Sequence, residues 1–315
     1  MLELFGLNFD REALRDRLFK LAAKGAFIGT SSWKYPGWLG MLYDRSLYEN
    51  RGRYSEKRFE DECLAEYGQF FRSVCVDAGY YKFPDPPYLD KLFGQVDPGF
   101  RLTFKVTDTI TIRRFPRLPR FGQVQGQFNE HFLNADLFRE RFLAPLQPFR
   151  DQTGVLIFEF SEFRETDFRH PEDFFAALDE FLGALPAGWR YGVEIRNESY
   201  LDPAYFRVLH RHNVTHVYNQ WTRMPTAEEQ LQLPKNATAD FAAARFLLTP
   251  GRAYEQAVQE FSPYTETKVV DPSARRAART LIWDAAVREG KPVFVYINNR
   301  LEGNALRTIW FLTEE

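Results

Sequence analysis

The stretch Tyr191-Gly-Val-Glu-Ile-Arg-Asn197 has the composition of a buried β-strand, yet it carries a carboxylate and a guanidinium two residues apart. Side chains at positions i and i+2 of a strand share one face, so Glu194 and Arg196 are expected to point the same way. Neither charge is stable in an apolar interior without a partner. The stretch therefore predicts a buried ion network or the floor of a binding site, with both side chains facing the inside of the fold and within reach of each other.

Other short apolar stretches along the chain alternate with helical patterns. The eight predicted strands are residues 27–30, 73–77, 100–106, 155–160, 191–197, 215–219, 243–248 and 292–298. The predicted helices are residues 10–24, 56–71, 88–96, 137–149, 172–185, 203–212 and 273–289. Strands that are apolar on both faces and joined by helices are typical of a (β/α)8 barrel.

We therefore predict a single TIM-type α/β barrel over residues 27–315, with residues 1–26 forming an N-terminal helical extension packed on it. A doubly wound open sheet is the alternative. No Gly-rich dinucleotide-binding loop follows the first predicted strand, and this weakens that alternative.

Composition narrows the class of protein. With 315 residues and 44% hydrophobic residues, the chain can bury a large core as one domain. Its 41 basic and 43 acidic residues give a net charge of -2, which provides no overall attraction to nucleic acid or to an anionic membrane. The two cysteines, Cys63 and Cys75, and a charged N-terminal stretch suggest a reduced, cytoplasmic protein. No apolar run of about 18 residues predicts a membrane span.

Polar residues recur at or near the carboxyl ends of the predicted strands. They are Asp77, Lys105, Glu159, Glu194, Arg196, Asn219, Arg245, Asn298 and Asn299. In a barrel these ends converge on one mouth, where active sites are built. Each residue alone could be a strand-end cap or part of an ionic layer that closes the barrel. Their coincidence on seven strands favours a functional site at the mouth.

Charge balance limits the chemistry of this site. Three carboxylates face three cations, whereas a divalent metal usually requires histidine and carboxylate ligands in excess. His210 and His212 do not share a helical face, and His216 begins a strand at the opposite end. We therefore expect no dedicated metal and no cofactor. Cys75 is expected to be a buried apolar thiol.

The charged residues suggest specific roles. Lys105, Arg196 and Arg245 are predicted to clamp the phosphate or carboxylate oxygens of a small polar or anionic ligand, since arginine forks match these groups. Glu194, with Glu159 as second choice, is predicted to be a general acid/base in metal-independent chemistry. The type of reaction, whether a hydrolase, a lyase or an isomerase, is not defined by these residues.

Further residues complete the predicted site. Asn298 and Asn299 are expected to orient hydroxyl or carbonyl groups, and Asp77 is expected to contact the ligand. Four aromatic residues could form a stacking wall or simply pack in the core, namely Trp33, Tyr35, Trp38 and Tyr80.

A second class of function stays open at this point. The same mouth, or the basic loop Arg113-Arg-Phe-Pro-Arg-Leu-Pro-Arg120, could serve a non-catalytic protein that binds a nucleotide, RNA or a protein partner. For the loop, a solvated surface segment is favoured over a nucleic-acid contact because the chain has almost no net charge. The two classes differ in whether a carboxylate of the mouth is free to move protons or is held by Arg and Lys.

Several motifs also carry a resemblance to a known family. In chain order they are Ile28-Gly-Thr-Ser-Ser-Trp-Lys-Tyr-Pro-Gly-Trp38, Tyr80-Tyr-Lys-Phe-Pro84, Phe100-Arg-Leu-Thr-Phe-Lys105, Val193-Glu-Ile-Arg196 and Val295-Tyr-Ile-Asn-Asn299. Residues 27–309 resemble the YecE-like family, domain of unknown function 72. The resemblance implies a TIM-like barrel and no established activity. Where the family pattern has Glu and then Asn on the second strand, this chain has Cys75 and Asp77.

Overall fold

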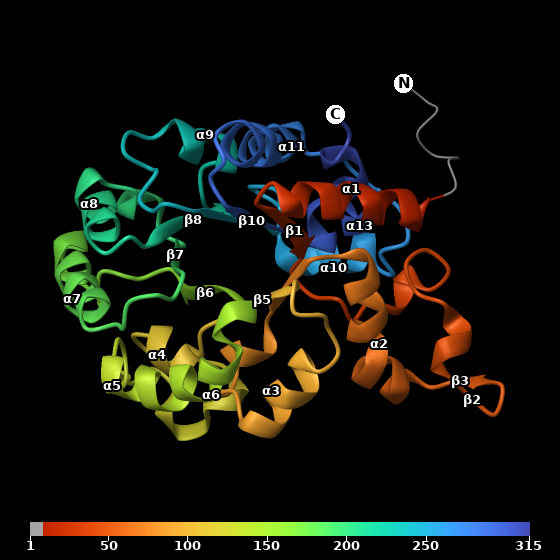
Figure 1. The fold of residues 1–315 in the computed structure, drawn as a ribbon. Helices are drawn as coiled ribbons and strands as arrows, with labels where there is room; N and C mark the ends of the chain where they lie inside the picture. The colour runs from red at the N-terminus through yellow and green to blue at the C-terminus, as the bar shows by residue number, and fades with distance from the viewer. Residues whose placement is uncertain (1–8) are drawn as a thin grey trace.

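Eight parallel strands form a nearly closed barrel at the centre of the computed structural model, which describes residues 9–315 (Figure 1). The sheet order is β1-β10-β9-β8-β7-β6-β5-β4. The strands are β1 (Ala26–Thr30), β4 (Ser73–Val76), β5 (Arg101–Lys105), β6 (Thr153–Phe160), β7 (Tyr191–Ile195), β8 (Thr215–Gln220), β9 (Ala242–Phe246) and β10 (Val293–Ile297). All eight predicted strands are present, and the predicted (β/α)8 barrel is confirmed.

Helices surround the barrel (Figure 1). The α-helices are α1 (Arg11–Ala23), α2 (Glu56–Phe70), α3 (Pro86–Phe93), α4 (Asp108–Thr111), α5 (Ala135–Phe138), α6 (Ala144–Leu146), α7 (Pro171–Gly183), α8 (Pro203–Arg211), α9 (Ala227–Gln232), α10 (Tyr254–Phe261), α11 (Pro272–Arg279), α12 (Asn299–Glu302) and α13 (Ala305–Leu312). The helix predicted at 137–149 is a series of shorter helical turns. The sequence analysis missed α4, α9, α10, α12, α13 and the peripheral hairpin of β2 (Glu49–Asn50) and β3 (Arg53–Tyr54).

Three of the barrel helices start with the dipeptide Asp-Pro. The carboxylates of Asp85, Asp202 and Asp271 accept hydrogen bonds from backbone N–H groups in the first turns of α3, α8 and α11. The following proline has no N–H to leave unpaired, and its fixed φ suits the first helical position. The dipeptide therefore marks the return of the chain from the mouth of the barrel into a helix.

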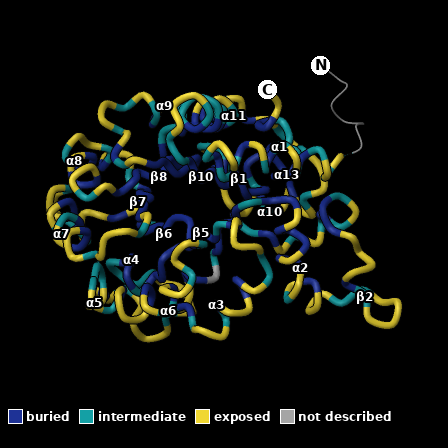
Figure 2. The backbone as a smooth tube through the Cα atoms, in the orientation of Figure 1, coloured by how far each residue is buried: buried dark blue, intermediate teal, exposed yellow. Residues whose placement is uncertain are grey.

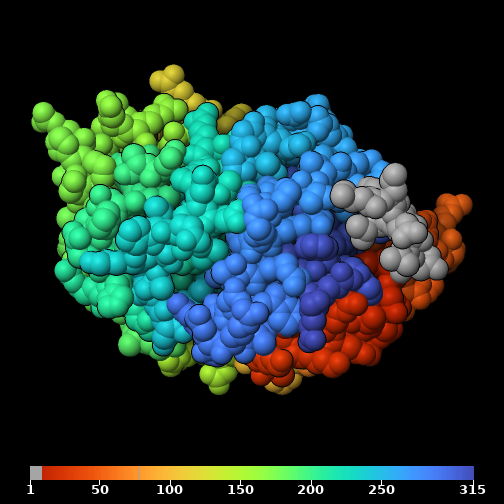
Figure 3. Space-filling view, turned by 90° about the horizontal axis from the view of Figure 1, so that it is seen from above, coloured from red at the N-terminus to blue at the C-terminus, as the bar shows by residue number. Residues whose placement is uncertain are grey.

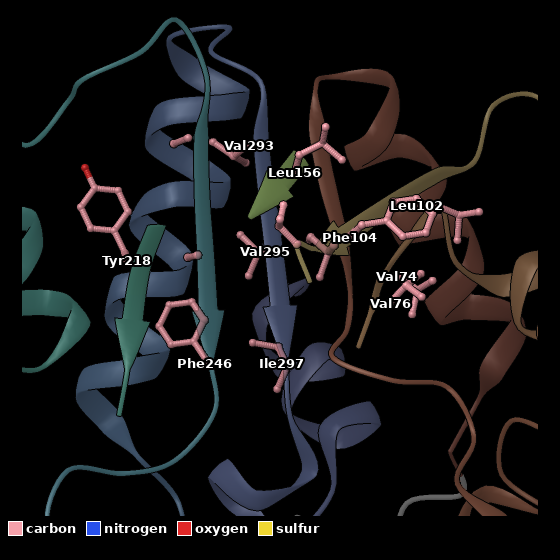
Figure 4. Close-up of a cluster of buried hydrophobic side chains, with 14 of the residues drawn as sticks. Val74, Val76, Leu102, Phe104, Leu156, Tyr218, Phe246, Val293, Val295 and Ile297 are labelled. Atoms are coloured by element: carbon pink, nitrogen blue, oxygen red, sulfur yellow. The ribbon is translucent and has the colours of Figure 1, made fainter. Parts of the chain in front are cut away.

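The core has two layers. Side chains that point outward from the strands, such as Val74, Leu102 and Val295, pack under the helices (Figure 4). Side chains that point inward form a smaller apolar cluster of Cys75, Val155, Ile157, Val217, Phe241, Ala243, Phe294 and Tyr296. Figure 2 shows the resulting pattern, with buried strands inside and exposed outer faces on the helices. The barrel interior is filled and is not a channel.

The barrel closes at the seam between β1 and β4, where no backbone ladder is formed. Instead, the Tyr67 hydroxyl from α2 accepts a hydrogen bond from the Thr30 N–H at 3.1 Å and donates one to the Ser73 carbonyl at 3.2 Å. Gly29 permits the close approach, since a Cβ at this position would lie 2.0 Å from the Ser73 carbonyl oxygen. One tyrosine side chain thus bridges the two edge strands.

The beginning of the described chain and the C-terminus lie side by side (Figures 1 and 3). Leu14, Leu18 and Leu21 bury one face of α1 in the main core. The Arg17 guanidinium of α1 lies 4.2 Å from the ring centroid of Trp310 in α13. Within residues 9–315, no helix combines the length and apolarity needed to cross a membrane.

Candidate functional site

Polar side chains from five strands, β5 to β9, meet at the mouth of the barrel. Glu159 on β6 and Glu194 on β7 are register partners, and so are Asn219 on β8 and Arg245 on β9. Although β9 and β6 are not neighbours in the sheet, Arg245 contacts Glu159. Such a contact requires both side chains to point inward, across the barrel.

Arg245 is the centre of this cluster. Its Nη1 lies 2.6 Å from Glu159 Oε2 and 2.7 Å from Glu194 Oε2, and its Nη2 lies 3.4 Å from Asp77 Oδ1. The side chain is only 3% exposed. A guanidinium can donate in several directions within one plane, so it joins three carboxylates where a lysine would supply a single point charge.

Glu159 accepts contacts from all three cations of the mouth. Its Oε2 lies 3.1 Å from Lys105 Nζ, 3.3 Å from Arg196 Nη2 and 2.6 Å from Arg245 Nη1. Burial alone raises the pKa of Glu159, but Lys105, Arg196 and Arg245 outweigh burial and hold the pKa well below its usual value. This carboxyl group is therefore ionised at neutral pH.

Glu194 is fully buried and forms ion pairs with Arg196 and Arg245. The predicted contact between Glu194 and Arg196 inside the barrel is confirmed. The Arg196 guanidinium also lies 4.1 Å from the ring centroid of Trp221, a contact that the sequence analysis did not predict. Trp221 directly follows the last residue of β8. This position just past a strand end could have identified it in the sequence as a residue of the mouth.

Asp77 is the exposed charged residue of the mouth, whereas Lys105 and Tyr80 are largely buried. Asp77 is 40% exposed and has one long contact, to Arg245. Lys105 Nζ lies 3.9 Å from the ring centroid of Tyr80. Burial lowers the pKa of Lys105, but Glu159 reverses this effect and the pKa is raised. Arg196 Nη1 and Asn219 Oδ1 are buried without a hydrogen-bond partner among residues 9–315.

Other predicted site residues serve the scaffold. Asn298 Oδ1 accepts from the Arg300 N–H and caps α12, and Asn299 Oδ1 accepts from the Ala305 N–H. Asn299 Nδ2 lacks a partner in the described part of the chain. Trp38 is completely buried and Trp33 is nearly so, which suits core packing.

The basic loop lies against its own barrel. Arg114 Nε is 2.9 Å from Asp167 Oδ1, and Arg120 Nη1 is 2.6 Å from Asp108 Oδ2. Burial raises the pKa of Asp108 even though Arg120 opposes the shift. Two of the four loop arginines thus have internal partners.

Neither thiol chemistry nor metal binding has an obvious site among the described residues. Burial raises the pKa of the Cys75 thiol to about 12, which leaves it protonated at neutral pH. No group of three His, Cys, Asp or Glu side chains in residues 9–315 is arranged to hold a metal ion.

Known structures share this fold. A DUF72 family protein from Enterococcus faecalis V583 aligns with a TM-score of 0.60 at 15% identity, covering 91% of this chain and 95% of that chain. A DUF72 family protein from Thermotoga maritima MSB8 aligns with a TM-score of 0.58 at 14% identity, covering 91% and 97% of the two chains. At such low identity these similarities establish the fold alone.

Sequence comparison assigns the family. No curated protein matches the chain. The model of the family described as "Protein of unknown function DUF72" matches residues 27–315, which include all but the first residue of the barrel strands and all the charged residues of the mouth. The chain therefore belongs to the DUF72 family.

Proposed function

We propose that the mouth of the barrel binds a small polar molecule that carries an anionic group. The observation that carries the proposal is the buried Arg196 Nη1, which has no hydrogen-bond partner within residues 9–315. An unpaired buried donor is costly, and an anionic oxygen would satisfy it. Lys105 is the adjacent cation, and its ammonium contacts one carboxylate. Because an ammonium can donate three hydrogen bonds, it can also donate to a ligand.

The charge of the mouth limits the charge of the ligand. Three cations and three carboxylates cancel, so a polyanion would gain little from the site. Asp77 is the exposed carboxylate, and it can accept a hydrogen bond from a hydroxyl or amino group of the same ligand. A molecule with one acidic group and one or more hydroxyls fits this set.

Binding without catalysis is favoured over acid/base chemistry by Glu194 or Glu159. Both carboxylates are held by two or three cations, and the lowered pKa of Glu159 makes it a poor proton donor at neutral pH. If a reaction occurs, Asp77 is the better candidate for a proton acceptor because it is exposed and weakly paired. The non-catalytic alternative thus gains support at the mouth, whereas the internal ion pairs of Arg114 and Arg120 argue against the 113–120 loop as its binding surface.

The test is an NMR titration of the tryptophan indole N–H signals with inorganic phosphate and with glycerate, a hydroxy acid with a single carboxylate, at constant ionic strength. Trp221 contacts Arg196, so its signal, assigned with Trp221→Phe, should shift upon binding. Lys105→Met should weaken binding about tenfold to a hundredfold, the loss expected for a charged hydrogen bond. Lys57→Met, a change of an exposed lysine on α2, is the matched control. An unshifted Trp221 signal, or equal affinity in Lys105→Met, would contradict the proposal.

A further inference from the structure

A pocket of about 710 Å³ lies at the opposite end of the barrel from the mouth. Its lining residues come from the segments that lead into β5, β6, β7, β8 and β9. They are Arg101, Arg150, Asp151, Gly188, Trp189, Arg190, Asn213, Asp240 and Phe241. We refer to it as the N-terminal pocket. Its volume lies within the range of roughly 300–1,000 Å³ that is common for small-molecule sites.

Two arginines of this pocket share the inward face of strands that also supply the mouth. Arg101 lies four residues before Lys105, and Arg190 lies four residues before Glu194. Four residues span about 13 Å along a strand. The apolar inward cluster, including Ile157 and Val217, separates the two levels. The N-terminal pocket is therefore separate from the mouth.

The charges of this pocket are not paired with one another. Three guanidinium groups and two carboxylates line it, and none of the five forms an ion pair within residues 9–315. Arg150 donates two hydrogen bonds to the Gly188 carbonyl, at 3.0 and 2.7 Å. Asp240 accepts one from Asn213 Nδ2 at 3.1 Å. This arrangement is the reverse of the mouth, where the cations are held by carboxylates.

Arg190 is the least satisfied of these three cations, and Arg101 bonds only to backbone carbonyls. Arg101 Nη1 donates to the carbonyls of Pro98 and Phe100 at 3.0 and 3.2 Å. The Arg190 guanidinium has no hydrogen bond in the described part of the chain and lies 5.7 Å from the ring centroid of Phe294. Burial lowers the pKa of Arg101, and the nearby Arg190 lowers it further. Asp151 and Asp97 offset these effects only in part, so a bound anion would stabilise both guanidinium groups.

We propose that the N-terminal pocket binds the phosphate group of a small hydroxylated phosphate monoester, with Arg101 and Arg190 as its ligands. Paired guanidinium forks match phosphate oxygens in geometry and charge. Asp151 and Asp240 accept hydrogen bonds from hydroxyl groups of the same molecule, and the Trp189 ring provides a flat apolar wall. This inference goes beyond the proposed function of the mouth and does not depend on it.

If Arg101 and Arg190 served only to stabilise the fold, their removal would have a different effect from the one that anion binding predicts. At the N-terminal end of a barrel, charged residues usually contribute to stability. Removing an arginine that stabilises the fold through ion pairs, hydrogen bonds or packing would lower the melting temperature. Since Arg101 and Arg190 repel each other, Arg190→Gln in phosphate-free buffer should leave the melting temperature unchanged or raise it. A clear decrease would overturn the proposal.

Binding is tested with ribose 5-phosphate as the probe and ribose as the control ligand, at constant ionic strength. The indole signal of Trp189, assigned with Trp189→Phe, should shift with ribose 5-phosphate and not with ribose. Arg190→Gln and Arg101→Gln should each weaken this binding at least tenfold. Arg53→Gln, a change of an exposed arginine in the β3 strand, should leave the affinity unchanged. Equal affinity in Arg190→Gln, or no shift of Trp189, would overturn the proposal.

The same titration separates this pocket from the mouth. Lys105→Met should abolish ligand-induced shifts of Trp221 while Trp189 continues to respond. Arg190→Gln should abolish the ligand-induced shift of Trp189 while Trp221 continues to respond. Loss of the Trp189 response in Lys105→Met would place the phosphate at the mouth and overturn the N-terminal site, whereas a silent Trp221 alone would count only against the proposed function.

Discussion

At the scale of single residues, the structure of the mouth depends on which carboxylate contacts which cation. Glu159 contacts three cations, and Arg245 contacts three carboxylates. Removing one partner of such a buried pair leaves the other charge desolvated, whereas replacing both costs less. The cluster therefore holds its members in fixed positions, and Asp77 is its most weakly paired carboxylate because it has one long contact.

The pKa of Glu159 predicts a loss of stability in acid. Its folded-state pKa lies well below the ordinary value of 4.5, so the unfolded chain takes up the proton first as the pH falls. The ionised Glu159 carboxylate contributes fully to the free energy of unfolding above about pH 4.5. This contribution is lost as the pH decreases towards the folded-state pKa. Glu159→Gln should be less stable at neutral pH and should show a shallower decline in the free energy of unfolding through this range. Urea unfolding at a series of pH values measures the effect.

The control for this prediction is Glu62→Gln, which removes an exposed carboxylate paired with Arg58 on α2. Its pH dependence should match that of the wild type because exposed ion pairs contribute little. If Glu159→Gln also matches the wild type, the three cations do not stabilise the Glu159 carboxylate as described.

At the scale of elements, the closure of the barrel rests on a side chain. Between β1 and β4 the usual ladder is replaced by hydrogen bonds of the Tyr67 hydroxyl to Thr30 and Ser73. The same hydroxyl lies 2.9 Å from Thr30 Oγ1. Edge strands with unpaired backbone groups are a liability, and here an α2 residue covers them.

Tyr67→Phe should lower the free energy of unfolding by about 1–3 kcal/mol, since it leaves a buried N–H and a buried carbonyl without partners. Hydrogen exchange should locate the change, with the Thr30 amide exchanging faster than in the wild type. Tyr191→Phe removes a hydrogen bond to the Pro186 carbonyl outside the seam and is the matched control. Unchanged protection of Thr30 in Tyr67→Phe would show that the seam is held by other contacts.

At the scale of the whole molecule, the helical extension and the C-terminus complete one core. Leu14, Leu18 and Leu21 of α1 belong to the same buried cluster as the outward side chains of the strands. The Arg17 guanidinium lies over Trp310 of α13. A continuous cluster of this kind favours cooperative unfolding of the extension together with the barrel.

Leu18→Ala should therefore destabilise the whole protein by about 2–5 kcal/mol, the cost of a cavity in a packed core. Circular dichroism and tryptophan fluorescence should still give coincident unfolding curves. Leu47→Ala, at a position that is 48% exposed, should have little effect. A separate early transition confined to helix content would instead show that α1 unfolds independently.

The sequence alone determined the alternation of strands and helices, and with it the barrel. It also determined which charges share the inward face, because side chains along a strand alternate with a period of two. This alternation is sufficient to assign Glu194 and Arg196 to the same face. Some shorter elements, such as α13, were missed.

Only the tertiary structure decided which of these charges pair, because a contact such as that of Arg245 with Glu159 depends on how the sheet curves and closes. It also decided that Tyr67 bridges the open seam, since nothing local to α2 indicates that β1 and β4 lie beside it. The N-terminal pocket likewise arises only in the tertiary structure. Its residues are spread from Arg101 to Phe241, and only the parallel arrangement of strands brings their starting points to one end of the barrel. Periodicity is a local property of a chain, whereas pairing and cavities arise from packing between distant segments.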